Sequence, residues 1–405
     1  MKSGEVGAER LERRAGELEI GLRKTLKREA GDMKKFFCMM TLALVVTIGG
    51  GCASAKSARS EKVANPLKVA VYADRGPSGI GAVEWWRLVH DSPEMELKLV
   101  DGAGVRAGAL EGQDLLIMPG GSDPTEAKTL GPEGLEKMKA FIREGGAYLG
   151  TCAGCCLLMD WKDMARIVPW RTRGRAGDLL FPNFKVNAAG AKALGIKEGD
   201  HRMRYHGGPF LWPSTNVIEG AKFECWGTYN AQACFKGKAN PQMHGAAGLI
   251  GGTYGKGRVF VTSGHPEYFP STQYIVKGAI RWLTGREVTL PRHQRRPGDV
   301  AVGYYAALRD ADGIATVRTM LALSDAPGVC LVPTDRDGIW EGRLRYLDAV
   351  VVPVPVKKGV LADLAAFQKR GGKILTVGSG NVNKIPGAIA CASAEEILKE
   401  VRNIK

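Results

Sequence analysis

Apolar runs of strand length alternate with amphipathic stretches of helix length along most of this chain. The runs with strand character lie at residues 67–72, 96–100, 114–118, 147–151 and 258–262. The stretches with helical periodicity lie at 82–90, 132–144 and 272–283. Runs that are apolar at nearly every position indicate strands buried on both faces of a parallel sheet. The alternation therefore predicts an α/β fold built on a flavodoxin-like, doubly wound parallel sheet.

The same pattern returns near the end of the chain, with strand-like runs at 300–305, 329–332 and 348–352 and a helical stretch at 314–323. Segment 367–380 aligns with 141–154, pairing a phenylalanine, a double glycine and a strand, so that Gly378 falls where Cys152 stands. We predict a first domain over 67–290 and a basic linker over 291–298. A second, smaller and degenerate flavodoxin-like α/β domain follows over 299–405, with a structural or dimerising role.

Residues 160–255 are less regular, because they are rich in glycine, proline and aromatic residues. We expect further strands there, for example over 248–251, and long loops over one edge of the sheet.

The N-terminal region has the pattern of an export signal over residues 33–55. Met33-Lys34-Lys35 precedes an apolar run over 36–48, which is too short to span a bilayer comfortably, and small residues follow up to Cys52. This arrangement resembles a bacterial lipoprotein signal, which implies lipidation of Cys52 and a location at the periplasmic face of the envelope. Cleavage at Ala53-Ser54-Ala55 followed by simple secretion is the alternative.

Two further segments flank this signal. Residues 1–32 are charge-rich; they are explained either by a true start at Met33 or by a cytoplasmic helical extension. Residues 56–66 have the composition of a flexible tether.

The net charge of +15 does not alter the predicted fold or the candidate function. Lysine and arginine are scattered, without a basic stripe interleaved with aromatic residues, so we do not expect nucleic acid as a partner. Nine cysteines in this length do not suggest a disulfide scaffold, although Cys225 and Cys234 could pair in an oxidising compartment. Cysteines with His206 or His244 have no recognised metal-ligand spacing, so we expect no metal and no cofactor.

Gly150-Thr151-Cys152-Ala153-Gly154 has the pattern of a strand that turns sharply into a helix. Small residues on both sides of Cys152 permit a strained turn that lifts its side chain clear of the sheet edge. A helix N-terminus at this point favours the thiolate, which is the reactive form. The alternative is a buried cysteine in a glycine-rich turn.

Two other elements follow strands directly: Pro119-Gly120-Gly121 after 114–118, and His265-Pro266-Glu267 after 258–262. Functional groups of a doubly wound sheet gather at the carboxyl ends of its strands, so both elements are expected beside Cys152. His265 and Glu267 then offer a base and its orienting group. The backbone N–H groups of the glycines and of Ala153 offer oxyanion donors.

These residues resemble the Cys-His-Glu triad and oxyanion loop of class I glutamine amidotransferase-like domains. The similarity is greatest to the family named for the N-terminal domain of biotin-protein ligases, to which 205–210 and 254–258 are also similar, and it covers about 67–285. The resemblance implies Cys152 as nucleophile, His265 as base and Glu267 as its orienting group. It also implies that oxyanion or substrate contacts come from Gly120, Gly121, Ala153, Tyr205, His206 and Gly207.

One position departs from the glutamine amidotransferase pattern. Cys156 stands where those enzymes usually carry glutamine four residues after the nucleophile, and no synthetase or biotin-ligase catalytic domain is visible. The resemblance therefore implies neither ammonia transfer nor biotinylation.

Three functions remain open from the sequence. The first is an exported Cys-His-Glu amidase or hydrolase that forms a thioester with a small-molecule or peptide amide and is held at the membrane by a lipid anchor. The second is a catalytically inactive envelope protein that binds a ligand or partner through a vestigial site. The third is thiol-disulfide chemistry at Cys152 and Cys155.

Overall fold

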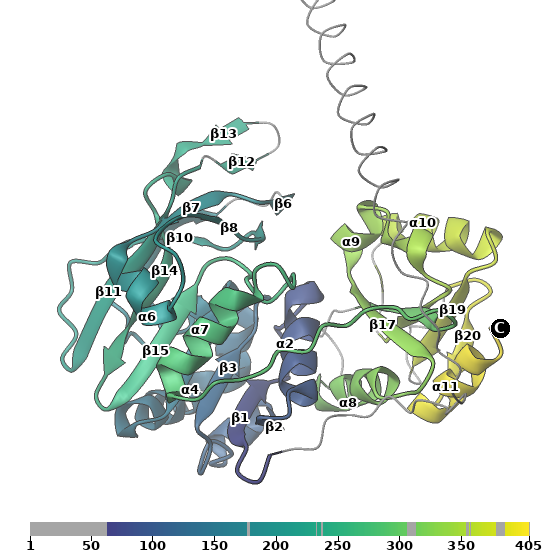
Figure 1. Ribbon diagram of the computed structural model, residues 1–405, viewed down its shortest axis with the longest axis horizontal. Helices are drawn as coiled ribbons and strands as arrows, with labels where there is room; N and C mark the ends of the chain where they lie inside the picture. The colour runs from purple at the N-terminus through teal and green to yellow at the C-terminus, as the bar shows by residue number, and fades with distance from the viewer. Residues whose placement is uncertain are drawn as a thin grey trace, which may run out of the picture. The chain divides into compact units, whose positions relative to one another are not determined.

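The computed structural model describes residues 63–175, 179–231, 233–235, 238–305, 313–353, 356, 358–377 and 385–404. These residues belong to one compact unit, Lys56–Lys405. The export signal, Cys52 and most of the tether lie outside the described residues. We call residues 63–290 the N-terminal lobe and residues 299–404 the C-terminal lobe (Figure 1).

The N-terminal lobe is built on an 11-stranded sheet, of which five neighbouring strands are parallel. In spatial order these are β2 (Met95–Val100), β1 (Leu67–Tyr72), β3 (Leu115–Met118), β4 (Ala147–Thr151) and β15 (Gly257–Thr262). The second strand lies outside the first, which is the 2-1-3-4-5 order of flavodoxin-like sheets. The prediction of a parallel doubly wound sheet is therefore confirmed for these five strands.

The remaining strands of this sheet are antiparallel to their neighbours. They are β14 (Ala247–Tyr254), β11 (Ala221–Tyr229), β7 (Asn183–Val186), β8 (Gly199–Arg202), β10 (Pro209–Pro213) and β5 (Trp170–Arg175). Two short pairs accompany them: β6 (Leu179–Leu180) with β9 (Tyr205–His206), and β12 (Ala233–Phe235) with β13 (Lys238–Asn240). The sheet is therefore mixed, and region 160–255 supplies the further strands that were expected there, including one over 248–251.

This extension includes β14, which contains the strand expected over residues 248–251. Strand β14 carries Gly248, Gly251 and Gly252, which lower its apparent strand propensity. Their spacing is required by packing, because a Cβ at Gly251 would lie 2.0 Å from the ring of Trp226 on β11. The glycines thus make room for a large aromatic side chain on the adjacent strand.

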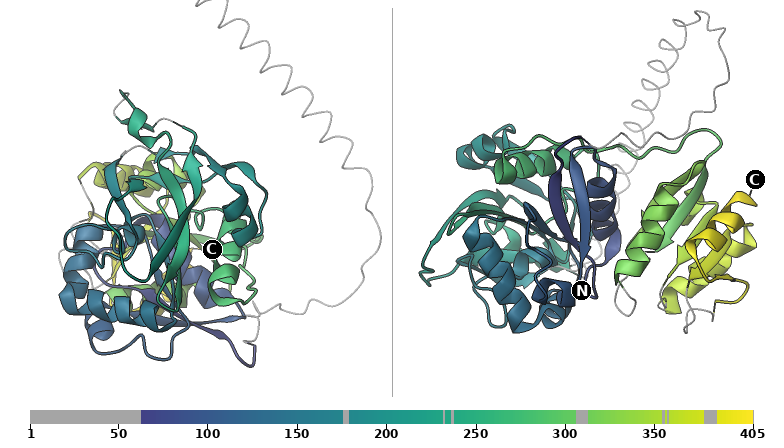
Figure 2. Two further views of the ribbon diagram at one scale, coloured as in Figure 1. Left: turned by 90° about the vertical axis from the view of Figure 1, so that its left-hand side faces the viewer. Right: turned by 90° about the horizontal axis from the view of Figure 1, so that it is seen from below.

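Helices cover both faces of the first sheet (Figures 1 and 2). They are α2 (Gly79–Asp91), α3 (Gly102–Arg106), α4 (Asp123–Glu144), α5 (Ala153–Cys156), α6 (Ala188–Leu194) and α7 (Gln273–Thr284), with a 3-10 turn η1 (Pro241–Met243). The side chains of β3 alternate between two apolar cores, one containing residues of α2 and α7 and the other residues of α4. Among the described residues, no helix combines the length and apolar character needed to cross a bilayer.

Helix α4 begins earlier than the predicted helix over 132–144. It is interrupted at Gly131, whose φ of 65° is not helical, and Pro132 begins the second segment. Proline is favoured at the start of a helix and not in its interior, so the periodicity was recognisable only after this break.

The C-terminal lobe has its own five-stranded sheet in the order β17-β16-β18-β19-β20, with every neighbouring pair parallel. Its strands are β16 (Val300–Tyr305), β17 (Val329–Thr334), β18 (Ala349–Val352), β19 (Lys373–Val377) and β20 (Ile389–Cys391). Its helices are α8 (Gly313–Ser324), α9 (Arg336–Trp340), α10 (Lys358–Lys369) and α11 (Ala394–Arg402), with a 3-10 turn η2 (Arg343–Tyr346). This sheet repeats the 2-1-3-4-5 order of the first.

The helix-to-strand turn before the last aligned strand is the same in both lobes. The ring of Phe141 lies 2.3 Å from the position a Cβ would take at Gly146, and Phe367 lies 2.3 Å from that of Gly372. The preceding glycine in each turn has a positive φ, 126° at Gly145 and 91° at Gly371. The aligned residues therefore make equivalent contacts, although Gly378, opposite Cys152, lies outside the described residues.

The two lobes pack together through α2, which contacts α8 and β17 (Figure 1). Trp85 and Trp86 of α2 are fully buried and share an apolar core with Val302, Val317 and other residues of the C-terminal lobe. The Arg87 guanidinium donates to the Leu331 carbonyl at 2.9 Å. Helix α2 is therefore covered on both sides.

Candidate active site

Cys152 occupies the strained turn expected between β4 and α5. Its φ of 52° and ψ of −109° lie outside the regions usual for a residue with a side chain. The turn depends on close backbone approaches: a Cβ at Gly150 would lie 2.6 Å from the Gly154 carbonyl oxygen, and a Cβ at Gly154 would lie 2.0 Å from that of Met118. The Tyr148 hydroxyl donates to the Gly154 carbonyl and holds the turn.

Helix α5 is only four residues long, shorter than the sequence suggested. The field of a single turn is weaker than that of a long helix, so it gives the Cys152 sulfur limited help. Charge stabilisation at this sulfur depends mainly on the neighbouring imidazole.

His265 and Glu267 lie beside Cys152. The His265 Nδ1 is 2.8 Å from the Glu267 Oε1, and Glu267 is fully buried. The position that a Cβ would take at Gly120 is 2.9 Å from the Cys152 Cβ and 2.6 Å from the His265 Cε1, so both side chains border the same small space. The three residues of the predicted triad are thus brought together from the ends of β4 and β15.

The charges of this group support one another. Burial lowers the pKa of His265, but the Glu267 carboxylate and the Cys152 sulfur raise it more strongly, to about 10. The imidazole is therefore protonated at neutral pH, and its positive charge favours a thiolate at Cys152. Cys152 is 7% exposed, and its Sγ lies 3.7 Å from the His206 carbonyl oxygen.

The loop after β3 is the segment that the sequence predicted as an oxyanion loop. It pairs with the loop before α2, where the Ser78 N–H donates to the Gly120 carbonyl and the Ser122 N–H to the Gly76 carbonyl. Within the described part of the chain, the N–H groups of Gly120 and Gly121 donate to no backbone carbonyl. Ala153, at the first position of α5, has an N–H without an intrahelical partner.

A cavity of about 1030 Å³ adjoins this loop. Gly121 lines it together with Asp123, Trp161 and Arg175. The Arg175 guanidinium binds the Asp123 carboxylate through two contacts of 2.8 Å. The exposed ring of Trp161 and the Asp123–Arg175 ion pair therefore both line this cavity, next to the candidate oxyanion donors.

Residues 204–206 connect the site to the C-terminal lobe. The Arg204 carbonyl accepts from the His265 N–H at 2.7 Å, and the Arg204 side chain, 3% exposed, pairs with Glu341 at 2.9 Å. The His206 Nε2 lies 3.4 Å from Asp337. Burial lowers the pKa of His206, against the effect of Asp337. Carboxylates of the C-terminal lobe therefore hold the segment that contacts both Cys152 and His265.

The other residues assigned from the resemblance have different surroundings. Tyr205 is fully buried, its hydroxyl donates to the Gly208 carbonyl, and its ring packs against Phe210 and Tyr229, which is a packing role. His206 contacts Cys152 through its backbone carbonyl. Gly207 has a φ of 65° and makes the turn that follows.

Sequence analysis missed Gly81 on α2. A Cβ at Gly81 would lie 2.5 Å from the Glu267 Oε1 and 2.8 Å from the His265 Nδ1. Only a residue without a side chain lets α2 pack against this hydrogen bond. A glycine inside an amphipathic helix was the available signal, because glycine lowers helix stability unless packing requires it.

Glu126 on α4 was also missed. It is fully buried, and neither carboxyl oxygen has a hydrogen-bond partner among the described residues. Burial, followed by the charges of Asp123 and Cys152, raises the pKa of Glu126 well above its usual value. Nothing in the amino-acid sequence indicated that Glu126 is buried, because a glutamate in the first turn of a helix is usually a solvated residue.

The remaining cysteines at the site are thiols in the structure. Cys155 and Cys156 are fully buried in an apolar core, as expected, and Cys152, Cys155 and Cys225 are free. Burial raises the pKa of Cys155 well above its usual value, so it does not supply a thiolate. Cys225, which the sequence allowed to pair with Cys234, is a free thiol.

Comparisons with known proteins give short matches. The family described as "Biotin-protein ligase, N terminal" matches residues 108–157, which include the Gly120–Gly121 loop and Cys152 but not His265. The pyridoxal 5'-phosphate synthase subunit PdxT of Corynebacterium jeikeium is 50% identical over 56 residues, 14% of this chain and 29% of that protein. The same subunit of Listeria monocytogenes is 35% identical over 77 residues, 17% of this chain and 41% of that protein.

Among solved structures, PurLQS from Thermotoga maritima aligns over 54% of this chain and 99% of that chain, with 14% identity and a TM-score of 0.39. The chain spans between 29% and 41% of the length of the curated relatives it matches. The family match and the PdxT relatives support a relationship to the glutamine amidotransferase-like proteins.

Proposed function

We propose that this protein is an enzyme of the amidase or hydrolase type that attacks an amide or related carbonyl with the thiolate of Cys152. One observation carries the proposal: Cys152 and the buried His265–Glu267 pair border one small space at Gly120. The raised pKa of His265 adds support, because a protonated imidazole beside the sulfur favours the thiolate.

The proposed reaction has two steps. The Cys152 sulfur bonds to the substrate carbonyl carbon, the oxyanion is held by N–H groups of Gly120, Gly121 and Ala153, and the C–N bond breaks. The amine leaves with the proton of His265, and a thioester remains. Water then attacks the thioester, giving its proton to His265, and the carboxylic acid leaves as the Cys152 thiolate is restored.

The substrate belongs to the class of small-molecule or peptide amides. Glutamine is a poor candidate, because Cys156 is fully buried and lies 3.6 Å from an Arg175 nitrogen, so this position offers no amide group. The cavity next to Gly121 is the proposed binding region for the part of the substrate beyond the scissile bond.

The proposed location follows from the sequence pattern of residues 33–55. We place the protein at the periplasmic face of the envelope, anchored to the membrane through a lipid on Cys52, with simple secretion as the alternative. The C-terminal lobe is proposed to be a degenerate domain of the same flavodoxin-like type, on the strength of its sheet order and of the matching Phe–Gly turns. Homodimer formation through this lobe stays a proposal.

The test measures the Cys152 thiolate directly by its ultraviolet absorbance, as the difference between wild type and Cys152→Ser. Absorbance at neutral pH that disappears in His265→Ala and persists in His244→Ala supports the assembled pair; His244 is an exposed histidine outside the site. Wild type is then incubated with a panel of amides and esters, and intact mass is followed for an acyl adduct that hydroxylamine removes.

An absent thiolate would overturn the enzyme proposal. A thiolate without any adduct favours the second candidate, an inactive protein that binds a ligand or partner. That candidate is favoured by the low exposure of Cys152 and by the C-terminal lobe carboxylates that hold residues 204–206 next to it. The redox candidate is disfavoured by the raised pKa of Cys155.

A further inference from the structure

Two adjoining cavities of the N-terminal lobe lie along the loop over residues 160–166. The cavity of about 1030 Å³ is lined by Gly121 of the candidate oxyanion loop, and a second cavity of about 430 Å³ is lined by Arg166 and Arg171. Trp161 and Lys162 line both cavities. A ligand that passes the ring of Trp161 would therefore reach from the oxyanion loop into the second cavity.

The first cavity offers an apolar surface on which the charges are balanced. Ala127 and Leu135 of α4 line it together with Trp161 and Met164 of the loop. Three acidic and three basic residues line it as well, namely Asp123, Glu136, Asp163, Lys128, Lys162 and Arg175. This cavity therefore suits an uncharged, apolar part of a ligand.

The second cavity carries an excess of positive charge. Its charged lining residues are Lys162, Arg166 and Arg171, against the single carboxylate of Asp160. Lys162 is exposed, and the side chains of Arg166 and Arg171 are 57% and 45% exposed. A surface of this kind attracts anions and binds an oxyanion more strongly than a neutral group.

Asp160 fixes the two arginines in place. Its carboxylate is 2% exposed and lies 3.2 Å from the Arg166 Nε and 3.4 Å from the Arg171 Nη2. The Asn216 side chain donates to the same carboxylate at 2.6 Å, and the Ser214 hydroxyl donates to it as well. Because a guanidinium has five N–H donors, each arginine keeps donors for a ligand after it has bound Asp160.

The loop that carries this network has an unusual backbone. Burial alone would raise the pKa of Asp160, but hydrogen bonds from Ser214, Asn216 and Arg166 lower it, so the carboxylate is charged at neutral pH. Asp163 and Arg166 have φ values of 64° and 55°, in the left-handed region that side chains disfavour. Such a conformation persists only where its surroundings fix it. The cationic groups are therefore held in position before a ligand arrives.

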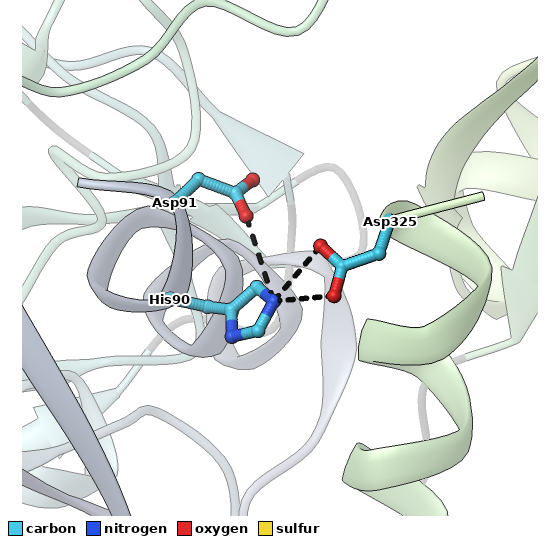
Figure 3. A group of neighbouring side chains, drawn as sticks. All are labelled: His90, Asp91 and Asp325. Atoms are coloured by element: carbon cyan, nitrogen blue, oxygen red, sulfur yellow. Dashed lines mark hydrogen bonds and ion pairs between the residues drawn. The ribbon is translucent and has the colours of Figure 1, made fainter. Parts of the chain in front are cut away.

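The charged residues that join the two lobes are arranged differently. Where α2 meets α8, the His90 Nε2 lies 3.0 Å from both carboxylate oxygens of Asp325 (Figure 3). Arg204 and Glu341 pair across the lobes in the same way, at 2.9 Å. Each of these groups faces a partner in the other lobe. In the second cavity three cations share one carboxylate, so positive charge is left for a ligand.

We propose that the substrate of the candidate active site is an elongated amide with an anionic end. Its scissile carbonyl lies at Cys152, and an apolar middle part packs beside Trp161. A terminal oxyanion, such as a carboxylate, binds Lys162, Arg166 and Arg171. This inference rests on the proposed function, because the cavities form a substrate site only if the chemistry takes place at Cys152.

Binding is measured on the purified full-length Cys152→Ala variant, which lacks the nucleophile, so that affinity is read without turnover. The ligands are suberic acid monoamide, with its anion on the acyl part, and N-acetyl aminocaproic acid, with its anion on the amine part. The methyl ester of each is the uncharged match. Calorimetry should show at least one acid binding about tenfold more tightly than its ester. Added salt should shrink this difference.

Variants in the same background test the cationic residues. Lys162→Gln and Arg166→Gln should each weaken binding of the acid by roughly threefold or more and leave binding of the ester unchanged. Lys358→Gln, an exposed lysine of α10, is the matched control and should bind both ligands as the parent does. Ligand binding should change the tryptophan fluorescence, and Trp161→Phe should remove that change.

The inference is overturned if acids and esters bind equally, if neither binds, or if the preference for the acid survives in Lys162→Gln and Arg166→Gln alike. Lys162 is exposed, so its variant is expected to fold. A missing Cys152 thiolate or acyl adduct would overturn the hydrolase proposal only, because these titrations are made without the nucleophile. The two failures are therefore distinguishable.

Discussion

Gly81→Ala tests whether the contact between α2 and the His265–Glu267 pair sets the charge of the imidazole. The new Cβ would lie 2.5 Å from the Glu267 Oε1, about 0.9 Å closer than the 3.4 Å at which ordinary contact begins. Glu267 is fully buried and has no route to solvent, so its carboxylate must move away from His265. The variant therefore weakens the 2.8 Å hydrogen bond without changing either partner.

The size of the effect follows from that bond. A hydrogen bond to a charged group contributes about 1.5–3 kcal/mol, and about 1.4 kcal/mol corresponds to one pKa unit. We expect the pKa of His265 to fall by about one to two units from its wild-type value of about 10. Helix propensity by itself would favour alanine by about 0.5–1 kcal/mol, so a loss of stability would also report the clash.

The assay is nitrogen NMR of the imidazole side chains, which is practicable because the chain has six histidines. Gly359→Ala is the matched control: it lies in helix α10, where the nearest atom to a new Cβ is 3.7 Å away. The control should titrate as wild type. If folded Gly81→Ala also titrates as wild type, the proposed role of this contact is wrong.

Three further predictions concern stability. Gly154→Ala places a Cβ 2.0 Å from the Met118 carbonyl oxygen; urea unfolding should show a loss of about 1–3 kcal/mol, and an unchanged midpoint would contradict the strained-turn argument. Because the folded pKa of His265 is raised from 6.5 to about 10, its contribution to stability is full below pH 6.5 and is lost as pH rises toward 10. His265→Gln should flatten this dependence, and an identical pH profile would refute it. The pKa of Glu126 is raised above 4.5, so its burial lowers the stability of the fold increasingly above that pH. Glu126→Gln should therefore raise the melting temperature at neutral pH. A lower melting temperature in this variant would show that the carboxylate is needed.

Much of the central fold was predictable because its signals are local. Strands buried on both faces must be apolar at nearly every position, so β1, β3 and β15 could be located from composition. The repeat of the helix-turn-strand unit was visible as well, since Phe141 and Phe367 each require a glycine to pack against. Of the antiparallel extension, the sequence located only the strand over 248–251, because the other strands depend on packing against neighbouring strands.

Some residues of the candidate site could also be predicted from the sequence, and others could not. Cys152, His265 and the Gly120–Gly121 loop each follow a strand, and parallel strands in one sheet bring their carboxyl ends to one edge. Tyr205 could not be assigned correctly, because the direction of its side chain depends on how 204–208 crosses the sheet edge. Glu126 gave no signal, since its burial results from the packing of α4 against the loop at Gly76.

The sequence by itself determined the order of strands and helices, the strained turn at Cys152 and the residues that share an edge with it. These depend on backbone preferences and on the period of apolar positions, which act over a few residues. Only the tertiary structure decided the packing of Gly81 against Glu267, the carboxylates that hold residues 204–206, and the meeting of His90 with Asp325. Such groups are dozens to hundreds of residues apart along the chain. Packing within the N-terminal lobe brings Gly81 to Glu267, and packing of one lobe against the other brings the remaining groups together.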